Sequence, residues 1–295
     1  MSARSGAHPT AAGALDASPA SHASHAADAS HSTAVAPAVW TRLVVAGTLA
    51  CAATAAAAQA DEPPQATPYR PGVGSPAVLS ATGYFELEAG YDNLRVTPLR
   101  SDSLSLLLKY GLSDRLGLLV GLNPTVRLSG PDGAQSGVSD TAVGLKFVQR
   151  GGPQFAWGAQ LVSTLPTGSR LLRSDTPVPT LTALAGFDWA QWHSDLNLGV
   201  TRLGDNPGSG ISRQRYGWSA SLSRPVVGPW SGTVELSGAR QVGLGNSAQV
   251  LGSLSYSVSR RLVLDAYVAR GRSNGNGIEL YNTGFGTGLT YLFAQ

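Results

Sequence analysis

The sequence predicts an all-β fold, a transmembrane antiparallel up-and-down β-barrel of about 12 strands. Three observations lead to this prediction. Apolar and polar residues alternate with a period of two in one run after another. Short and long connections alternate between these runs. No stretch after residue 60 is apolar over the ~18 residues that a membrane-spanning helix requires.

The composition differs from that of an ordinary soluble enzyme. Charged residues make up 13% of the 295 residues, whereas about 25% is usual. Glycine is abundant, with 36 residues. The formal net charge of +3 is small for this length, and no basic cluster is interleaved with aromatic residues. We therefore expect no nucleic-acid partner.

Residues 1–60 have the pattern of a leader and signal peptide that are removed. Arg42 precedes an apolar run over residues 43–58, and Ala58-Gln59-Ala60 supplies a small-residue cleavage site. We expect cleavage after Ala60. A buried soluble helix and a lipoprotein signal at Cys51 are the alternatives. Because Cys51 is the only cysteine, the mature chain should hold neither disulfides nor thiolate metal sites.

The segments on either side of this signal show no alternation. Residues 1–39 are rich in Ala, Ser and His, and they are an unstructured leader, a start codon assigned too early, or a metal-binding stretch. Residues 61–82 carry five prolines and predict an extended or irregular segment. That segment is either a periplasmic tail or a plug-like element folded into the barrel mouth. Residues 83–293 would then form the barrel.

The clearest alternating stretch is Leu104–Leu122, which predicts two strands and a tight turn. Ser113-Asp114 marks the turn, because Asp can bond to its own main chain there. One face of the hairpin is continuously apolar, and the other is small or polar with one lysine. The same pattern predicts the remaining strands, at about 83–93, 139–148, 154–165, 178–189, 193–202, 213–224, 230–240, 248–259, 262–270 and 281–293.

The connections between these strands indicate how they are arranged. Short connections are expected at 113–114, 150–153, 190–192, 225–229 and 259–261, and longer loops near 93–102, 129–138, 166–177, 203–212, 241–247 and 271–280. Short periplasmic turns alternating with longer outer loops, and an even strand number, are typical of outer-membrane barrels. A soluble sandwich also alternates, but it explains neither the export signal nor the alternating loop lengths.

The polar face of each strand should line the lumen. The charged and amide candidates there are Glu86, Glu88, Lys109, Asp140, Lys146, Gln160, Asp188, Asp195, Arg215, Glu235 and Asp265. They could form a constriction that selects solutes by charge, or they could pair with one another and fill a narrow barrel. Both interpretations remain open at the level of the sequence.

Several aromatic residues fall near predicted strand ends, where aromatic girdles meet the membrane interfaces. These girdle candidates are Tyr110, Phe147, Phe155, Trp189, Trp218, Tyr291 and Phe293. The expected partners are outer-membrane lipid, a small-molecule solute, and the barrel-assembly machinery, which would recognise the C-terminal strand ending near Phe293. Arg213-Gln214-Arg215, near a barrel end, should meet lipid phosphates or solvent.

Several short pieces carry a resemblance to a known family. They are Arg70-Pro71-Gly72, residues 86–91 (ELEAGY), residues 108–116 (LKYGLSDRL), residues 139–146 (SDTAVGLK) and Leu165-Pro166-Thr167-Gly168. In order and spacing, residues 69–168 resemble the outer-membrane transporters named for the MetA pathway of phenol degradation. The family often has an acidic residue before Arg-Pro-Gly, where this chain has Tyr69. The resemblance implies passage of aromatic or other hydrophobic compounds.

Enzymatic activity is not expected. His193 is the only histidine after the predicted signal, and no conspicuous serine and acid accompany it. A single histidine without cysteine is also a poor start for a metal site, and no cofactor is expected. We expect a channel or transporter in the cell outer membrane. The alternative is a closed structural or adhesive barrel whose outer loops, near 166–177 and 203–212, bind a ligand.

Overall fold

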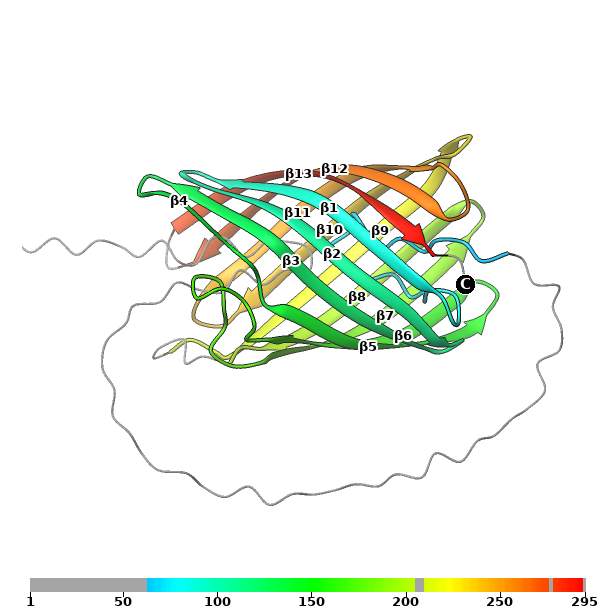
Figure 1. Ribbon diagram of the computed structural model, residues 1–295, viewed down its shortest axis with the longest axis horizontal. Helices are drawn as coiled ribbons and strands as arrows, with labels where there is room; N and C mark the ends of the chain where they lie inside the picture. Colours follow the sequence, from blue (N-terminus) through cyan, green and yellow to red (C-terminus); the bar gives the residue numbers. More distant parts are fainter. Residues whose placement is uncertain (1–62, 205–209, 276–277, 294–295) are drawn as a thin grey trace, which may run out of the picture. The chain divides into compact units, whose positions relative to one another are not determined.

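The fold is a closed antiparallel β-barrel (Figure 1). The computed structural model describes residues 63–204, 210–275 and 278–293, and every strand and turn below lies within them. The sheet runs in the order β2-β1-β13-β12-β11-β10-β9-β8-β7-β6-β5-β3-β4, and β2 also pairs with β3. That last pairing closes twelve strands into a ring, with β4 as an addition on β3. The predicted fold class and strand number are therefore confirmed.

The strands are long enough to cross a bilayer when tilted. They are β1 (Phe85–Val96), β2 (Leu99–Ser113), β3 (Leu116–Gly130), β4 (Gly133–Gly137), β5 (Thr141–Gly152), β6 (Phe155–Leu165), β7 (Val178–Trp189), β8 (Trp192–Arg202), β9 (Gln214–Val227), β10 (Trp230–Gln241), β11 (Gly245–Ser257), β12 (Leu262–Gly275) and β13 (Ile278–Leu292). In the same described ranges, no helix is both long and apolar enough to span a membrane.

Closure follows from continuous pairing around the ring. The first and last strands pair antiparallel, with Glu86 opposite Leu292. Strand β2 pairs with β3, from Arg100 opposite Ser129 to Ser113 opposite Leu116. In hydrocarbon every backbone N–H and C=O must find a partner within the protein, and a closed ring leaves no unpaired edge. The barrel therefore satisfies its own backbone where water cannot.

The two faces of the barrel wall invert the arrangement of a soluble protein. Outward-facing Leu198 and Val268 are 69% and 66% exposed, whereas inward-facing Glu86 and Lys146 are both 0% exposed. Soluble proteins bury apolar residues and almost never bury Lys or Glu without partners. An apolar outer surface around a polar interior is suited to lipid, so the soluble sandwich is wrong.

Strand positions were better predicted than strand ends. The prediction of 178–189 matches β7, but β3, β12 and β13 extend beyond the predicted runs. The long loops expected near 93–102, 241–247 and 271–280 are wrong, since the strands continue there and leave short connections. Beyond the membrane, two strands can pair through backbone hydrogen bonds alone, without an apolar face. The strand ends rich in Ser, Gly and Asn therefore continue the pairing although their sequence does not alternate. Strand β4 has no alternation for the same reason.

The predicted signal peptide and its cleavage site after Ala60 lie outside the described residues. The segment that follows it, predicted for residues 61–82, is described from Pro63 onward. It forms no strand, and its contacts belong to the site below.

The placement of the apolar face gives a first prediction. We expect Leu198→Arg, in the middle of β8, to destabilise the folded barrel in lipid by about 2–4 kcal/mol. Val227→Arg, at the end of β9 beside a turn, should cost about 0–1 kcal/mol. The two native side chains are equally exposed, at 69% each, so depth in the membrane is the main difference. Urea unfolding in phospholipid vesicles measures both, and equal costs would argue against the membrane placement.

Candidate functional site

A chain segment lies inside the barrel and contacts its wall on several sides. We call residues 64–82 the lumenal segment. Near its start, Ala66 N donates to Arg260 O, in the β11–β12 turn, at 2.8 Å. At its end, Thr82 Oγ1 donates to Asp114 Oδ1, in the β2–β3 turn, at 2.8 Å. Both ends therefore lie at the short-turn end of the barrel, and the middle of the segment extends into the interior.

The first contact inside the barrel is a buried cluster around Lys109. Its Nζ lies 2.8 Å from Glu86 Oε1 and 2.6 Å from Glu88 Oε1, and it donates to Thr67 O at 2.6 Å. The three charged side chains are at most 1% exposed. Glu86 and Lys109 are directly opposite on β1 and β2, so the sheet register brings the charges together.

The same two carboxylates also hold the backbone of the lumenal segment. Glu86 accepts from Thr67 N at 2.9 Å, and Glu88 accepts from Tyr69 N at 2.7 Å and from Arg70 N at 3.1 Å. These N–H groups have no sheet partner, so the wall carboxylates take that role. The cluster therefore binds the segment in this structure and does not face an open passage.

Tyr69 occupies the space between two wall lysines. The Nζ atoms of Lys109 and Lys146 lie 3.9 Å and 3.7 Å from the centre of its ring. Its hydroxyl donates to Val78 O at 2.8 Å, so this bond joins the part of the segment that enters the lumen to the part that returns. Burial, followed by the nearby charges of Glu88 and Glu86, raises the pKa of Tyr69, so the phenol keeps the proton that it donates.

Arg70 lies over a glycine pair on the wall. Gly90 and Gly288 are opposite on β1 and β13, and a Cβ on Gly90 would lie 2.2 Å from the Arg70 Cζ. The guanidinium is 3.3 Å from Asp92 Oδ1, and its Nη1 donates to Ser105 Oγ at 2.9 Å. The absent side chains at the two glycines let the guanidinium approach the backbone closely.

Two further residues complete the surroundings of Arg70. Tyr267 Oη donates to Asp92 Oδ1 at 2.9 Å, and Asp265 Oδ1 lies 3.7 Å from the Arg70 Nε. The cluster therefore joins the lumenal segment to β1, β2 and β12. Arg70 was part of a family motif in the sequence, whereas nothing local in the sequence identified Asp92 or Tyr267 as its partners.

The tip of the lumenal segment crosses to the far wall. Val73 N donates to Glu235 Oε1 on β10 at 2.9 Å, and Ser75 N donates to Asn197 Oδ1 on β8 at 3.1 Å. In the ring order, β8 stands opposite β1, which holds the start of the segment. The segment therefore bridges the whole lumen.

Residues 75–77, where the segment turns back toward the short-turn end, bind other predicted wall residues. Lys146 Nζ donates to Ser75 Oγ at 2.7 Å and to Pro76 O at 2.6 Å, while Ser75 Oγ donates to Gln160 Oε1 at 2.9 Å. Ala77 N donates to Asp195 Oδ1 at 3.0 Å. Wall and segment thus share their hydrogen bonds on this side as well.

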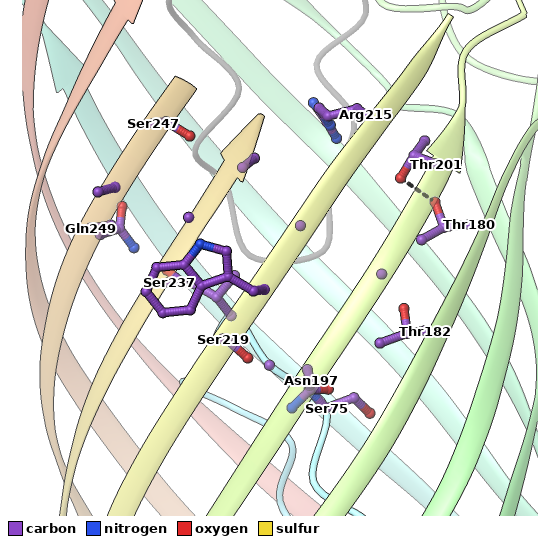
Figure 2. Close-up of a pocket in the computed structure, with 18 of the residues that line it drawn as sticks. Ser75, Thr180, Thr182, Asn197, Thr201, Arg215, Ser219, Ser237, Ser247 and Gln249 are labelled. Atoms are coloured by element: carbon purple, nitrogen blue, oxygen red, sulfur yellow. Dashed lines mark hydrogen bonds between the residues drawn. The ribbon is translucent and has the colours of Figure 1, made fainter. Parts of the chain in front are cut away.

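A cavity of about 230 Å³ lies on the loop side of the segment tip. Val73, Gly74 and Ser75 bound it from the segment, and residues of β6 to β11 form its wall. Figure 2 shows hydroxyl and amide groups on this wall, from Ser75, Thr180, Thr182, Asn197, Thr201, Ser219, Ser237, Ser247 and Gln249, together with Arg215. Trp218, Val73, Ala239 and Ala248 supply an apolar part of the lining. The cavity therefore offers many hydrogen-bonding groups to a small solute.

The remaining polar candidates lie away from this cavity. Asp140 precedes β5 and holds the outer loop 166–177, accepting from Gly168 N at 2.9 Å and from Ser174 N at 2.8 Å. Asp188 sits at the short-turn end with a 60% exposed side chain and lies 2.8 Å from His193 Nδ1. The other ring nitrogen, Nε2, is 2.9 Å from Asp195 Oδ2. Neither Asp140 nor Asp188 lines the cavity.

The aromatic candidates gather at the short-turn end, with one exception. Tyr110 packs on Phe85 with ring centres 4.5 Å apart, and Phe155 packs on Phe187 at 4.9 Å. Phe147, Trp189, Tyr291 and Phe293 also lie near that end and are between 36% and 53% exposed. Trp218 lies near the opposite end, in the first part of β9. A girdle role for these residues stays a prediction.

A family model matches residues 70–295 of this sequence. The chain belongs to the family described as "Putative MetA-pathway of phenol degradation". The resemblance seen in residues 69–168 is thereby confirmed. No curated protein is significantly similar to the chain in sequence.

Solved structures share the barrel fold. An outer membrane channel from Pseudomonas putida F1 is 17% identical, with a TM-score of 0.60 over 74% of this chain and 98% of that one. The CymD monoaromatic hydrocarbon channel is 10% identical, with a TM-score of 0.48 over 73% and 90% of the two chains. A KdgM porin in complex with disordered oligogalacturonate is 13% identical, with a TM-score of 0.48 over 70% and 99%. The similarity to the Pseudomonas putida F1 channel supports the barrel fold described above.

The buried cluster gives a second prediction. We expect Lys109→Met to destabilise the barrel by about 3–5 kcal/mol, because it leaves two buried carboxylates without their cation. Adding Glu86→Gln and Glu88→Gln should restore most of this loss, since the amides keep hydrogen bonds without charge. Urea unfolding of the single and triple variants measures the difference. A triple variant as unstable as the single one would contradict the pairing.

Proposed function

We propose that the chain is an outer-membrane channel that passes small molecules through the barrel lumen. The observation that carries this proposal is the cavity of about 230 Å³ inside a closed barrel, bounded on one side by the lumenal segment. Family membership and the channel-like fold support the same function. Because the segment bridges the lumen, passage requires its displacement or a route beside its tip.

The cavity wall combines hydrogen-bonding groups with apolar surface. Asn197 is 6% exposed, and its Nδ2 has no hydrogen-bond partner among the described residues. Serine and threonine hydroxyls lie around the cavity, and Trp218 with Val73 adds apolar surface to its lining. A phenol, with one hydroxyl and an apolar ring, and a small polyol both fit the volume of the cavity. The family name supports the aromatic class, and the wall chemistry supports the polar part of such a solute.

Catalysis is not part of the proposal. Both ring nitrogens of His193 face carboxylates, Asp188 on one side and Asp195 on the other, so neither nitrogen is available to activate a serine. We further propose that lipid surrounds the apolar face. The terminal strand β13 would be the element that the barrel-assembly machinery recognises.

A closed structural barrel is the second candidate, and the bridging segment is the observation in its favour. In that case the outer loops would carry the function. The loop at 166–177 is a fixed surface, because Asp140 holds it through Gly168 and Ser174. The following experiment separates the two candidates.

Movement of the lumenal segment can be controlled with one disulfide. A Cβ on Gly74 would lie 2.3 Å from Ser219 Oγ, so Gly74→Cys with Ser219→Cys should form a bond between the segment tip and β9. In planar bilayers we expect small currents from the oxidised protein and larger currents after reduction. The same molecule is its own control, and each single variant controls for the reductant.

The outcomes of that measurement are distinct. Equal currents before and after reduction would mean that solutes pass beside the segment and that its movement is not required. Stable insertion without current in either state would contradict the channel and favour the closed barrel.

Solute class gives a fourth prediction. In liposome-swelling assays, we expect small polyols and phenol to enter faster than an apolar aromatic such as toluene after correction for leakage through protein-free liposomes. Ser219→Ala with Ser237→Ala should slow the polyols more than toluene, because two hydroxyls leave the cavity wall. Unchanged rates for all solutes would show that these hydroxyls do not contact the permeating molecule.

A further inference from the structure

Arginines gather on the outward face of the barrel at the end that carries the longer loops. Seven of them, all exposed, lie on outward rows of strands: Arg95, Arg100, Arg127, Arg202, Arg240, Arg270 and Arg272. We call this set the arginine belt. On β12, for example, exposed Leu264, Ala266 and Val268 precede Arg270 on the same face. The belt therefore begins where the apolar band of the wall ends.

Three members of the belt share one register row. Arg270 on β12 is opposite Thr283 on β13, Thr283 is opposite Arg95 on β1, and Arg95 is opposite Arg100 on β2. Side chains directly opposite each other in an antiparallel pair share a face, and neighbouring strands are about 4.8 Å apart. Like charges directly opposite destabilise a sheet. Arg95 and Arg100 therefore form an unfavourable pair unless an anion lies between them.

The protein supplies too few anions to compensate this row. Asp102 Oδ1 lies 2.8 Å from Arg100 Nη2, and it also accepts from Asn93 Nδ2 at 2.7 Å and from Tyr91 Oη. Glu279 Oε1 is 3.7 Å from Arg272 Nη1. These two acids are the outward-facing carboxylates near the row in the described chain. Neither forms an ion pair with Arg95 or Arg270 there.

We propose that the arginine belt binds the phosphate groups of the phosphorylated glycolipid that forms the outer leaflet of the outer membrane. The longer loops mark this end of a barrel as the outer one. Guanidinium groups bind phosphate through paired hydrogen bonds, and a row of three can hold more than one phosphate.

Aromatic side chains close to the arginine row fit a headgroup region. The rings of Tyr91 and Phe285 are 6.1 Å apart on β1 and β13. Both lie on the membrane side of the arginine row, Phe285 two residues from Thr283 and Tyr91 four residues from Arg95. Tyr281, which is 59% exposed, stands opposite Arg272. Rings with one polar end are suited to the boundary between hydrocarbon and headgroups. The proposal rests on the outer-membrane placement and holds whether or not the barrel conducts.

The other end of the barrel offers a matched control. There the outward Arg224 lies 4.9 Å from the centre of the Trp192 ring, so its charge already has a partner. Arg115 and Arg261 lie in or beside the short turns and form no register row. The triple variant Arg115→Gln, Arg224→Gln, Arg261→Gln thus removes the same formal charge from the inner end.

The test measures binding of bisphosphorylated lipid A to the purified full-length protein in detergent, by native mass spectrometry and by the shift in thermal unfolding. We expect Arg95→Gln with Arg100→Gln and Arg270→Gln to weaken binding about a hundredfold, because each arginine near an anionic lipid surface raises the affinity by a factor of roughly five. The matching arginine-to-lysine triple should retain most of the affinity. The inner-end control should bind like the natural protein.

Three results would overturn the proposal. The first is equal affinity of the glutamine triple and the natural protein. The second is equal binding of dephosphorylated lipid A by the natural protein, a comparison that stands even if the variants fail to fold in a heat-modifiability gel. The third is equally strong, equally arginine-dependent binding of phosphatidylglycerol, which would make the belt a general anionic-lipid surface.

Discussion

The ion pairs of Lys109 with Glu86 and Glu88 are the contacts on which the interior of the barrel depends. Removing three charges from water is costly, and Coulomb attraction compensates this only when the remaining hydrogen-bonding sites are also filled. The backbone of Thr67, Tyr69 and Arg70 fills them. The wall charges therefore require the lumenal segment, and the segment, which has no strand partner, requires the wall. The two are stabilised as one unit.

This mutual dependence also suggests why the segment can move. Each hydrogen bond between segment and wall contributes only about 0.5–1.5 kcal/mol net, because water can replace either partner. Strand pairs in lipid have no such substitute. Breaking the hydrogen bonds of the segment therefore costs less free energy than breaking the strand pairs of the wall, because water can replace the partners of the segment only. The part of the interior that can yield to a solute is therefore the segment and not the ring.

The sequence predicted the ring better than its contents, for a physical reason. A period of two is a local property, so it located β7 at its true bounds and placed Glu86 and Lys109 on one face. The partners of those charges are not local. Val73 binds Glu235, 162 residues away, and only the closed ring brings them together. Five prolines in residues 61–82 indicated irregular backbone, but nothing in them indicated which wall residues the segment would contact.

Arginine is treated in two different ways by this barrel. Inside, Arg70 is surrounded by Asp92, Asp265 and Ser105, and two glycines make room for it. The protein has built the anionic site that this cation needs. Outside, Arg95 and Arg270 stand in a row of like charge, and the described chain builds no such site for them. A protein surrounded by lipid can leave this compensation to the leaflet, because the anions are always present there. The inner arginine thus fixes the chain to itself, whereas the outer ones are suited to fixing the barrel at one depth in its membrane.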